Sequence, residues 1–377
     1  MLYVIDSLAP GGAETSLASM APHLDRLGIE LHVCYFRESD GVHDQLRAAG
    51  ATLHHVAASR ARRVPALRRL IRELRPDVLH TTLYEADQAG RVAGALTRRP
   101  VVTSLVSTGF ELGPWRTLAG QRARAAVVVD AVTARAVTAF HAVSTPVAEV
   151  MARRLLVRRD RFTVIPRGRE PGTLGERSDE RSRTVRDRLG LDADTPLVVA
   201  IGREVLPKGH TTLLRAVPAI AAEIPGVRVL IAGRRGDQSD EITATIDELG
   251  IERHVRRLGH RTDVPDLLAA ADVLAFPSSR EGFPGTLVEA LALECPIVAS
   301  DIPAIRSILE APDGMLLGTM VPAGDSATLA RSLVATLRSP RDDAVLAAGR
   351  LAFADRFTTE AVAERMVALY RSTLGRR

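Results

Sequence analysis

Hydrophobic and polar positions alternate in a repeating order along most of the chain. Short apolar runs are followed by longer stretches in which apolar residues recur at helical spacing. This order is typical of an α/β protein whose parallel sheet carries helices on both faces. The runs that we interpret as strands are residues 2–6, 30–36, 52–56, 77–80, 100–105, 140–144, 161–165, 196–202, 227–233, 255–259, 272–276 and 296–300.

A polar, charged stretch at residues 170–188 separates these runs into two sets. Such a stretch is typical of a linker that leads into a helix. Because 377 residues are many for a single hydrophobic core, we predict two α/β domains. The N-terminal domain is predicted over residues 1–168 and the C-terminal domain over residues 169–357.

The composition, with 46% hydrophobic residues, fits a packed soluble protein. We expect a cytoplasmic protein, because no stretch is apolar enough to span a membrane and no basic leader precedes the first strand. Cys34 and Cys295 have no metal or redox spacing, which is consistent with a reducing compartment. Aromatic residues are 3% of the chain and no recognition motif is present, so a nucleic-acid partner is not expected.

Arginine supplies all but one of the 50 basic residues, and the single lysine is Lys208. So general a bias reduces what an arginine-rich patch indicates, and it makes the lone lysine more informative. The basic stretches at residues 60–75 and 116–124 have two interpretations, a solvated face or a peripheral contact with an anionic membrane surface. We favour the solvated face.

The segment from Phe276 to Asp301 contains the most informative polar pattern. An apolar strand leads into a turn rich in proline, serine and glycine, and the turn leads into a helix. Glycines let the backbone approach a ligand closely, and the free N–H groups of a helix start suit a phosphate. Glu281 in the turn and Glu289 in the helix are suited to accept hydrogen bonds from sugar hydroxyls beside that phosphate. We therefore predict a nucleotide-sugar site, with Thr286 as a helix cap.

A second pattern follows the predicted strand at residues 196–202. Arg203 and Lys208 lie in a turn that leads into a helix. A diphosphate leaving group needs cations, and these two side chains offer a bidentate fork and a flexible point charge. Near the amino terminus, Gly11 and Gly12 form a glycine turn between a strand and a helix, where backbone can approach a ligand.

These motifs resemble those of glycosyltransferase family 4, whose members are retaining GT-B glycosyltransferases. The resemblance rests on the E-x7-E pattern that begins at Glu281, on G-R-x4-K-G at residues 202–209, on GGAE at 11–14 and on I-P-x-G at 165–168. It implies two Rossmann-like parallel-sheet domains facing a cleft, with the acceptor bound by the N-terminal domain and the nucleotide sugar by the C-terminal domain. It also implies that the last helix, within residues 358–377, crosses back to the N-terminal domain.

The resemblance implies a role for each candidate residue in transfer of a sugar from UDP or GDP with retention at the anomeric carbon. The catalytic candidates are Arg203 and Lys208, which would clamp the diphosphate, and Glu281, which would hold sugar hydroxyls. Among the donor-binding candidates, Glu289 would bind the ribose and Arg261 would stack on the base. The donor-binding candidates are Gly11, Gly12, Arg261, Phe283, Pro284, Gly285, Thr286, Leu287 and Glu289.

On the acceptor side, His80, Asp87 and Ser107 are candidates. His80 and Asp87 follow a predicted strand and would orient an acceptor hydroxyl. The alternative for each of these two is a satisfied loop or capping residue, and we leave both interpretations open.

Departures from the family pattern affect what the resemblance implies. Val106 stands where many relatives have a histidine that contacts the donor sugar, and Ser107 or Thr108 is the nearest hydrogen-bonding substitute. Pro303 removes a backbone donor near the sugar. The interdomain turn, I-P-N-G-V-D in the family, is IPRGRE at residues 165–170. The identities of the sugar, the base and the acceptor stay open.

Other functions are compatible with this architecture. A nonhydrolysing nucleotide-sugar 2-epimerase would perform acid–base chemistry at a sugar carbon, and a noncatalytic nucleotide-sugar binder would use the same site. We expect no cofactor and no metal, because the one D-x-D, at residues 192–194, precedes a strand and no acidic or histidine cluster has ligand spacing. No general base is evident. The expected partners are the nucleotide-sugar donor and a small-molecule, glycan or lipid-linked acceptor.

Overall fold

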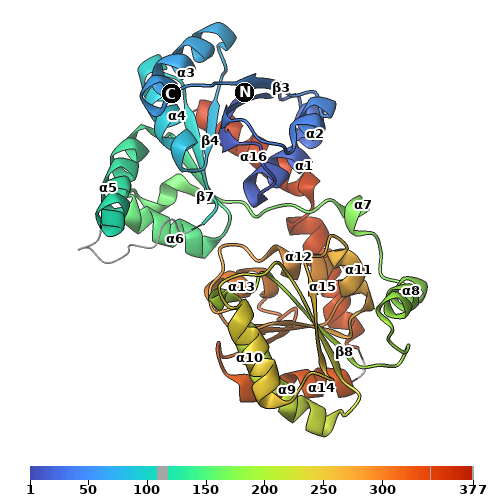
Figure 1. Ribbon diagram of the computed structural model, residues 1–377. Helices are drawn as coiled ribbons and strands as arrows, with labels where there is room; N and C mark the ends of the chain where they lie inside the picture. Colours follow the sequence, from blue (N-terminus) through green and yellow to red (C-terminus); the bar gives the residue numbers. More distant parts are fainter. Residues whose placement is uncertain (108–117, 340, 376–377) are drawn as a thin grey trace. The chain divides into compact units, whose positions relative to one another are not determined.

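The computed structural model describes residues 1–107, 118–339 and 341–375 (Figure 1). The chain divides into two compact units, one made of residues 1–168 with the residues from 358 onward and the other of residues 169–357. Each unit contains one parallel sheet, as the strand pattern predicted. Thr108 and the start of the basic stretch at 116–124 lie outside the described residues.

The first unit contains a seven-stranded sheet in the order β3-β2-β1-β4-β5-β6-β7, with every pairing parallel. Its strands are β1 (Leu2–Ser7), β2 (His32–Arg37), β3 (Thr52–His55), β4 (Leu79–Thr82), β5 (Val101–Leu105), β6 (Ala139–Ala142) and β7 (Phe162–Val164). Its helices are α1 (Gly12–Arg26), α2 (His43–Ala48), α3 (Arg60–Leu74), α4 (Tyr84–Thr97), α5 (Leu118–Thr133), α6 (Thr145–Arg154) and α16 (Thr359–Leu374), with short 3-10 turns η1 (Ala134–Ala136) and η2 (Arg159–Arg161).

The C-terminal helix α16 belongs to the first unit, as the resemblance implied. It packs against α1, and Figure 1 shows the red α16 beside the blue α1. Val362, Met366 and Tyr370 of α16 enter the same core as Leu17 of α1. The end of the chain is thus part of the first hydrophobic core.

The second unit contains a six-stranded sheet in the order β10-β9-β8-β11-β12-β13, again with every pairing parallel. Its strands are β8 (Leu197–Ile201), β9 (Arg228–Ala232), β10 (Val255–Gly259), β11 (Val273–Phe276), β12 (Ile297–Ser300) and β13 (Thr319–Val321). Its helices are α7 (Pro171–Leu174), α8 (Asp179–Leu189), α9 (His210–Glu223), α10 (Ser239–Leu249), α11 (Val264–Ala270), α12 (Gly285–Ala292), α13 (Pro303–Leu309), α14 (Ser326–Arg338) and α15 (Asp343–Arg356), with the 3-10 turn η3 (Leu206–Lys208).

Strand β8 shows how this second sheet is covered on both faces. Leu197 and Val199 enter the core that α11, α12 and α15 cover, whereas Val198 and Ala200 enter the core beneath α9 and α14. Successive side chains of a strand point to opposite faces, so a continuous apolar run suits a strand that is buried on both. The carboxyl edge of the sheet is then the place where polar side chains can meet a ligand.

Candidate functional site

The predicted catalytic residues gather at the carboxyl edge of the second sheet. Strands β8 and β11 are neighbours there. The turn after β8 carries Arg203 and Lys208, and the turn after β11 carries Glu281 and leads into α12. Sequence-distant loops are therefore adjacent at the edge where open α/β sheets bind their ligands.

Lys208 and Glu281 form an ion pair at this edge. The Nζ of Lys208 lies 2.6 Å from Oε1 of Glu281, and the two side chains are 24% and 10% exposed. The ammonium group also lies 5.4 Å from the ring centre of Phe276. Each partner compensates for the other's partial loss of water, and part of the lysine side chain stays exposed. The pair can thus present a cation and a hydroxyl acceptor to one ligand.

Glycines permit this close approach. Gly209 has a φ of +66°, a conformation that favours glycine, and a Cβ at this position would overlap the carbonyl group of Pro277. A Cβ on Gly202 would lie 3.1 Å from Cδ of Lys208. The lysine side chain therefore crosses directly over the backbone of Gly202, which explains two glycines of the predicted G-R-x4-K-G pattern.

A buried ion pair, which the sequence pattern did not indicate, anchors the same turn. Glu204 is 2% exposed and accepts hydrogen bonds from the Arg257 Nε, at 2.9 Å, and from the Ser239 hydroxyl. Burial acts to raise the pKa of Glu204, but these hydrogen bonds outweigh it and hold the pKa below its usual value. The Nε2 of His210 also lies 3.2 Å from the carbonyl oxygen of Arg203. The turn is thus fixed by the contacts of Glu204 and by the contact of His210 with its backbone.

Arg203 and Arg261 line a cavity of about 280 Å³ at the ends of β8, β9 and β10. Within the described part of the chain, the exposed Arg203 side chain makes no hydrogen bond or ion pair. Arg261 pairs with Asp263, with 2.8 Å between Nε and Oδ1. A Cβ on Gly233 would overlap the carbonyl group of Gly202, so this glycine lets the strand ends converge. The predicted contact of Arg261 with the base stays a prediction, and Asp263 is the group that orients its guanidinium.

The start of α12 also lies at this edge. The helix begins at Gly285, its N-cap residue is Pro284, and no side chain caps it. Our prediction that Thr286 caps the helix is therefore wrong, because Thr286 lies inside the first turn. Leu287 is fully buried in the core, so only its backbone remains a donor-binding candidate, and the Phe283 ring packs beside another ring of that core. An uncapped helix start suits an anion.

Glu289 lies one turn into α12 and is paired with an arginine that the sequence analysis had not placed in the site. The Nε of Arg169 lies 2.6 Å from Oε1 of Glu289, and the side chains are 28% and 15% exposed. The sequence marked residues 165–170 only as a departure from the family pattern. The two partners are 120 positions apart, so no local signal could have joined them.

In the first unit, Gly12 begins α1 and Gly11 is its N-cap residue, as the glycine turn predicted. A Cβ on Gly12 would overlap the guanidinium of Arg167, and a Cβ on Gly11 would lie 2.5 Å from Oε2 of Glu14. Glu14 is buried. These glycines therefore let a guanidinium and a carboxylate lie against the first turn of α1. Their contact with a donor stays a prediction.

A buried chain of hydrogen bonds crosses the first unit and includes His80. Its side chains come from α16, β4, β5 and β6, and all of them are buried. The bonds run from the Tyr370 hydroxyl to His80 Nδ1 (2.6 Å), from His80 Nε2 to Ser104 Oγ (2.6 Å), from Ser104 Oγ to His141 Nδ1 (2.6 Å) and from His141 Nε2 to the carbonyl oxygen of Ile165 (2.7 Å).

The carbonyl group at the end of this chain fixes the direction of every bond. A carbonyl oxygen only accepts, so neutral His141 donates from Nε2 and accepts from Ser104 at Nδ1. Ser104 then accepts from His80, which accepts from Tyr370. Burial lowers the pKa of His141 to about 4 and the pKa of His80 well below its usual value, so both rings are neutral at neutral pH. Both nitrogens of His80 are occupied, which favours the satisfied-residue interpretation over contact with an acceptor.

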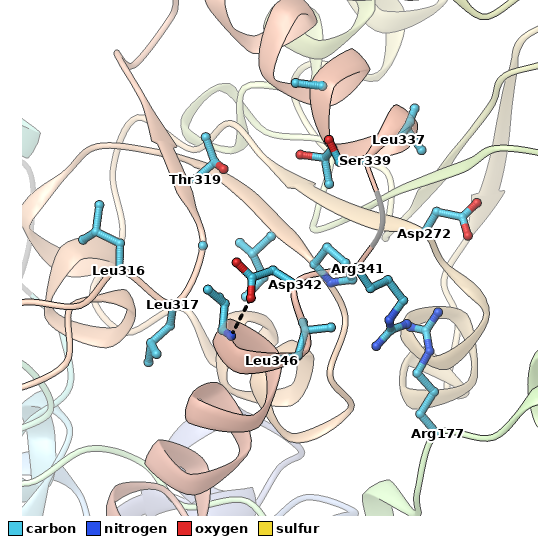
Figure 2. Close-up of a pocket in the computed structure, with 16 residues that line it drawn as sticks. Arg177, Asp272, Leu316, Leu317, Thr319, Leu337, Ser339, Arg341, Asp342 and Leu346 are labelled. Carbon is cyan, nitrogen blue, oxygen red and sulfur yellow. Dashed lines mark hydrogen bonds between the residues drawn. The ribbon is translucent and has the colours of Figure 1, made fainter.

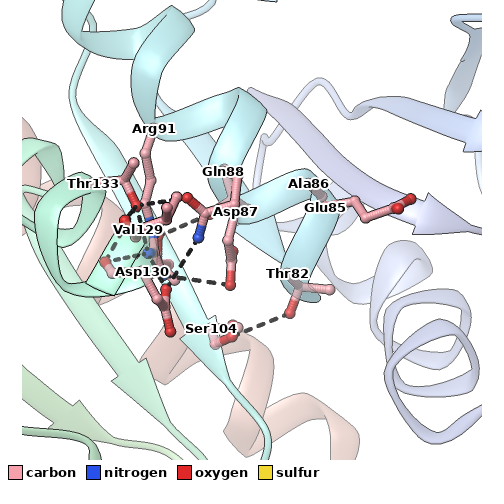
Figure 3. A network of polar contacts seen from close by, with 12 residues as sticks. Thr82, Glu85, Ala86, Asp87, Gln88, Arg91, Ser104, Val129, Asp130 and Thr133 are labelled. Carbon is pink, nitrogen blue, oxygen red and sulfur yellow. Dashed lines mark hydrogen bonds and ion pairs between the residues drawn. The ribbon is translucent and has the colours of Figure 1, made fainter. Parts of the chain in front are cut away.

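Asp87 lies in a second buried network, on α4 (Figure 3). Arg91, one turn further on, is fully buried and lies 3.4 Å from Asp87 and 2.6 Å from Asp130 of α5. Burial raises the pKa of Asp87 to about 7, although Arg91 acts in the opposite direction. The structure favours an internal role here too. Ser107 is exposed beyond the end of β5, and Val106 lines a cavity of about 50 Å³ beside His80.

A cavity of about 450 Å³ in the second unit is lined by none of the predicted residues (Figure 2). Asp272 and Pro296 line it and directly precede β11 and β12, so the cavity lies at the amino edge of the sheet. Its arginines, Arg177 and Arg341, both donate to backbone carbonyl oxygens. This cavity is therefore separate from the edge that carries Lys208.

The basic stretch at 60–75 forms helix α3 of the first unit. Arg60 and Arg63 both pair with Glu85, and Arg63 lies over the ring of Phe36, so part of its charge is used internally. Contact with a membrane surface stays a prediction. Among the described helices, none has the length and apolar character that crossing a bilayer requires, and no cluster of three or more His, Cys, Asp and Glu side chains in the described residues could hold a metal.

Comparison with known proteins establishes the class to which this fold and site belong. Residues 10–172 match the family model described as Glycosyltransferase Family 4, and residues 195–339 match the model described as Glycosyl transferases group 1. The D-inositol 3-phosphate glycosyltransferase of Xylanimonas cellulosilytica is 30% identical over 313 residues, which cover 80% of this chain and 73% of that relative. The chain belongs to glycosyltransferase family 4.

Other similar proteins match part of the chain or share its fold. The phosphatidyl-myo-inositol mannosyltransferase of Mycobacterium leprae is 41% identical over 146 residues, covering 38% of this chain and 37% of that relative. The crystal structure of Anabaena Alr3699/HepE in complex with UDP superposes with a TM-score of 0.82 at 22% identity, covering 98% of this chain and 99% of that one. A glycosyltransferase from Rickettsia africae gives a TM-score of 0.83 at 14% identity over 100% of this chain and 99% of that one. The fold is GT-B, as predicted.

Proposed function

We propose that this protein transfers a sugar from a UDP- or GDP-sugar to an acceptor hydroxyl with retention at the anomeric carbon. The observation that carries the proposal is the 2.6 Å ion pair of Lys208 and Glu281 at the carboxyl edge of the second sheet. One cation and one carboxylate at this spacing suit the junction between a diphosphate and a sugar. The uncapped start of α12 at the same edge adds a second group that favours an anion.

Transfer depends mainly on stabilising the leaving diphosphate. Lys208 would stabilise the negative charge that develops on the leaving phosphate as the glycosidic bond breaks, and the exposed Arg203 would bind the same group through its guanidinium fork. Glu281, held by Lys208, would accept hydrogen bonds from hydroxyls of the departing sugar. The buried Glu204 would contribute by keeping the turn that carries Arg203 in place.

No side chain with an obvious general-base role accompanies these groups, so the leaving phosphate is proposed to accept the acceptor's proton. A phosphate oxygen on the same face as the departing sugar would deliver the acceptor to that face, which gives retention. The proposed reaction requires no metal because Lys208, Arg203 and the α12 start supply the positive charge. Activity in the presence of a chelator is therefore expected.

The acceptor proposed for the first trials is an inositol phosphate or phosphatidylinositol. The support is that relatives matching this chain are named for inositol-containing acceptors, a phosphatidyl-myo-inositol mannosyltransferase and a D-inositol 3-phosphate glycosyltransferase. UDP is the first nucleotide to test, because a structure of the same fold is a complex with UDP. GDP and its sugars form the second arm of the same screen.

Product analysis tests the proposal. The protein is incubated with UDP- and GDP-sugars, with and without acceptor and with chelator present, and transferred sugar, free nucleotide and epimerised donor are quantified separately. Transfer above background supports the proposal, epimerised donor without acceptor indicates the epimerase, and binding without any product indicates the noncatalytic binder.

Lys208→Met tests the central residue. Loss of a charge-stabilising group is expected to lower kcat by on the order of 10²–10³-fold, with a much smaller change in melting temperature. Arg181→Met is the matched control, because Arg181 pairs with Asp266 in the same unit at similar exposure but outside the proposed site. Equal turnover by the parent and Lys208→Met would show that Lys208 takes no part in the reaction.

A further inference from the structure

Arg169 has a place in the second unit that none of the preceding roles explains. Its guanidinium pairs with Glu289 through Nε, 2.6 Å from Oε1. It also passes directly over the start of α12, where a Cβ on Gly285 would overlap its Nη2. A cation over a helix start is unfavourable by itself, because the N-terminus of a helix carries partial positive charge. The carboxylate of Glu289 pairs with the guanidinium there and offsets this unfavourable charge.

A backbone hydrogen bond fixes the position of Arg169. The N–H of Arg169 donates to the carbonyl oxygen of Phe357 at 2.8 Å, so the base of the side chain is anchored within the same unit. Gly285 lacks a side chain at the point where the guanidinium crosses. The pair is mostly withdrawn from water, with Arg169 28% exposed and Glu289 15% exposed. An ion pair so placed restricts the rotation of the Glu289 carboxylate.

The contacts of Glu289 leave one oxygen available. Among the described residues, the hydrogen bond and the ion pair of this carboxylate both come from Arg169 and both involve Oε1. Oε2 keeps its acceptor capacity. A carboxylate with one oxygen fixed and the other open is suited to accept from the neighbouring hydroxyls of a ribose.

We propose that Arg169 is a positioning residue that fixes the Glu289 carboxylate for the ribose hydroxyls of the donor. The proposal rests on the proposed function and on the expectation from the family resemblance that Glu289 binds the ribose. Under this proposal the protein prefers ribonucleotides to deoxyribonucleotides. The preference depends on Arg169 through its effect on Glu289, without direct contact between Arg169 and the ribose. Removing the guanidinium would leave the carboxylate free to rotate and would weaken the contact.

The test compares the affinity for a ribonucleoside diphosphate with that for its 2′-deoxy analogue, UDP against 2′-deoxy-UDP and GDP against 2′-deoxy-GDP. Isothermal titration calorimetry is performed on the parent, Glu289→Gln, Arg169→Met, Arg169→Gln, Arg169→Lys and the double variant Glu289→Gln/Arg169→Met. We expect the parent to prefer the ribonucleotide about tenfold, the value of one charge-assisted hydrogen bond. In Glu289→Gln, Arg169→Met and Arg169→Gln the preference is expected to fall to about twofold or less.

The remaining variants separate positioning from general stability. Arg169→Lys should recover part of the preference, and the double variant should lose no more than either single change, because both act on one contact. Arg181→Met, which breaks the Arg181–Asp266 pair, should lower the melting temperature and leave the preference unchanged. A merely structural role for Arg169 would lower stability in the same way without changing the ratio of affinities.

The outcomes distinguish this inference from the proposed function. If Glu289→Gln loses the preference while Arg169→Met and Arg169→Gln keep it, the positioning role is refuted and the ribose site stands. If either Arg169 variant binds both nucleotides more tightly, Arg169 blocks the site and the inference is equally refuted. If Glu289→Gln keeps the preference, the ribose does not depend on Glu289 and this inference alone is refuted, because the proposed function rests on Lys208 and Glu281 and is tested by product analysis. If the parent binds no nucleotide, both proposals fail.

Discussion

His80 and His141 make the first unit sensitive to acid, because their buried rings resist protonation in the folded protein. Both rings are buried and neutral, and burial lowers the pKa of His141 to about 4 and that of His80 well below its usual value. In the unfolded chain each ring takes up a proton near pH 6.5, whereas in the folded chain it does not. The stability that these rings contribute is therefore fully present above pH 6.5 and is lost as the pH falls toward 4.

The prediction is a loss of unfolding free energy of roughly 1.4 kcal/mol per histidine for each pH unit between about 6 and 4.5. Asp87 acts in the opposite sense, because its pKa is raised to about 7 and the folded state holds that proton over the same range. The His141→Gln variant keeps Asp87, so comparing it with the parent cancels the contribution of Asp87 and isolates that of His141. The glutamine can accept from Ser104 and donate to the Ile165 carbonyl without titrating. Urea unfolding from pH 7.5 to 4.5 should show a steeper loss in the parent than in His141→Gln. Parallel curves would contradict the assignment of His141 as a buried neutral ring.

At the scale of single residues, the sequence singled out side chains that the structure brings together, but not the residues that hold them. Lys208 stood out because it is the only lysine in a chain of arginines and follows an apolar strand. Its contact with Glu281 agrees with the prediction of one site. Arg169 and Glu204 could not be predicted, because each depends on a partner supplied by a distant element, Glu289 of α12 and Arg257 of β10.

At the scale of elements, the buried chain joins helix α16 to strands β4, β5 and β6 and to the residue after β7. Ser104 is its middle member. Ser104→Ala would leave the His80 Nε2–H without an acceptor and His141 Nδ1 without a donor, both of them buried. Each unsatisfied group costs about 1–3 kcal/mol, so for two groups we expect a loss of roughly 2–6 kcal/mol in unfolding free energy.

Equilibrium urea unfolding at pH 7.5 measures this loss. Ser372→Ala is the matched control, because Ser372 is an exposed serine of α16 whose hydroxyl bonds only a carbonyl of its own helix. The control is expected to change the unfolding free energy by less than about 0.5 kcal/mol. A Ser104→Ala protein as stable as the control would show that the hydrogen-bonded chain contributes nothing.

The elements themselves were predictable where hydrophobic pattern decided the outcome. The runs at 196–202, 227–233 and 272–276 contain β8, β9 and β11. The strand β13 (Thr319–Val321) was missed because it is short and only its last residue is fully buried, so it has no apolar run. The helix after the Glu281 turn was expected, but its cap was misassigned, since Thr286 resembles a cap in sequence and lies inside the first turn in the structure.

At the scale of the whole molecule, the repeated strand–helix pattern and a few motifs were enough to predict the GT-B fold. Each of the two parallel sheets has its own core, and the C-terminal helix joins the first. The acceptor could not be predicted, because His80 and Asp87 were open between acceptor contact and an internal role. In the fold His80 bonds Tyr370 and Asp87 lies beside Arg91, and local sequence does not encode such contacts with other elements.

The placement of Lys208 at the diphosphate is tested most directly by following Lys208 itself during donor binding. Because Lys208 is the only lysine, reductive ¹³C-methylation labels one side chain besides the amino terminus, and the label keeps the positive charge. Lys208→Arg identifies the signal by its loss. On titration with UDP or GDP, we expect a saturable shift of the Lys208 methyl signal whose midpoint equals the calorimetric dissociation constant. Nucleotide binding that leaves this signal unchanged would contradict the placement of Lys208 at the diphosphate.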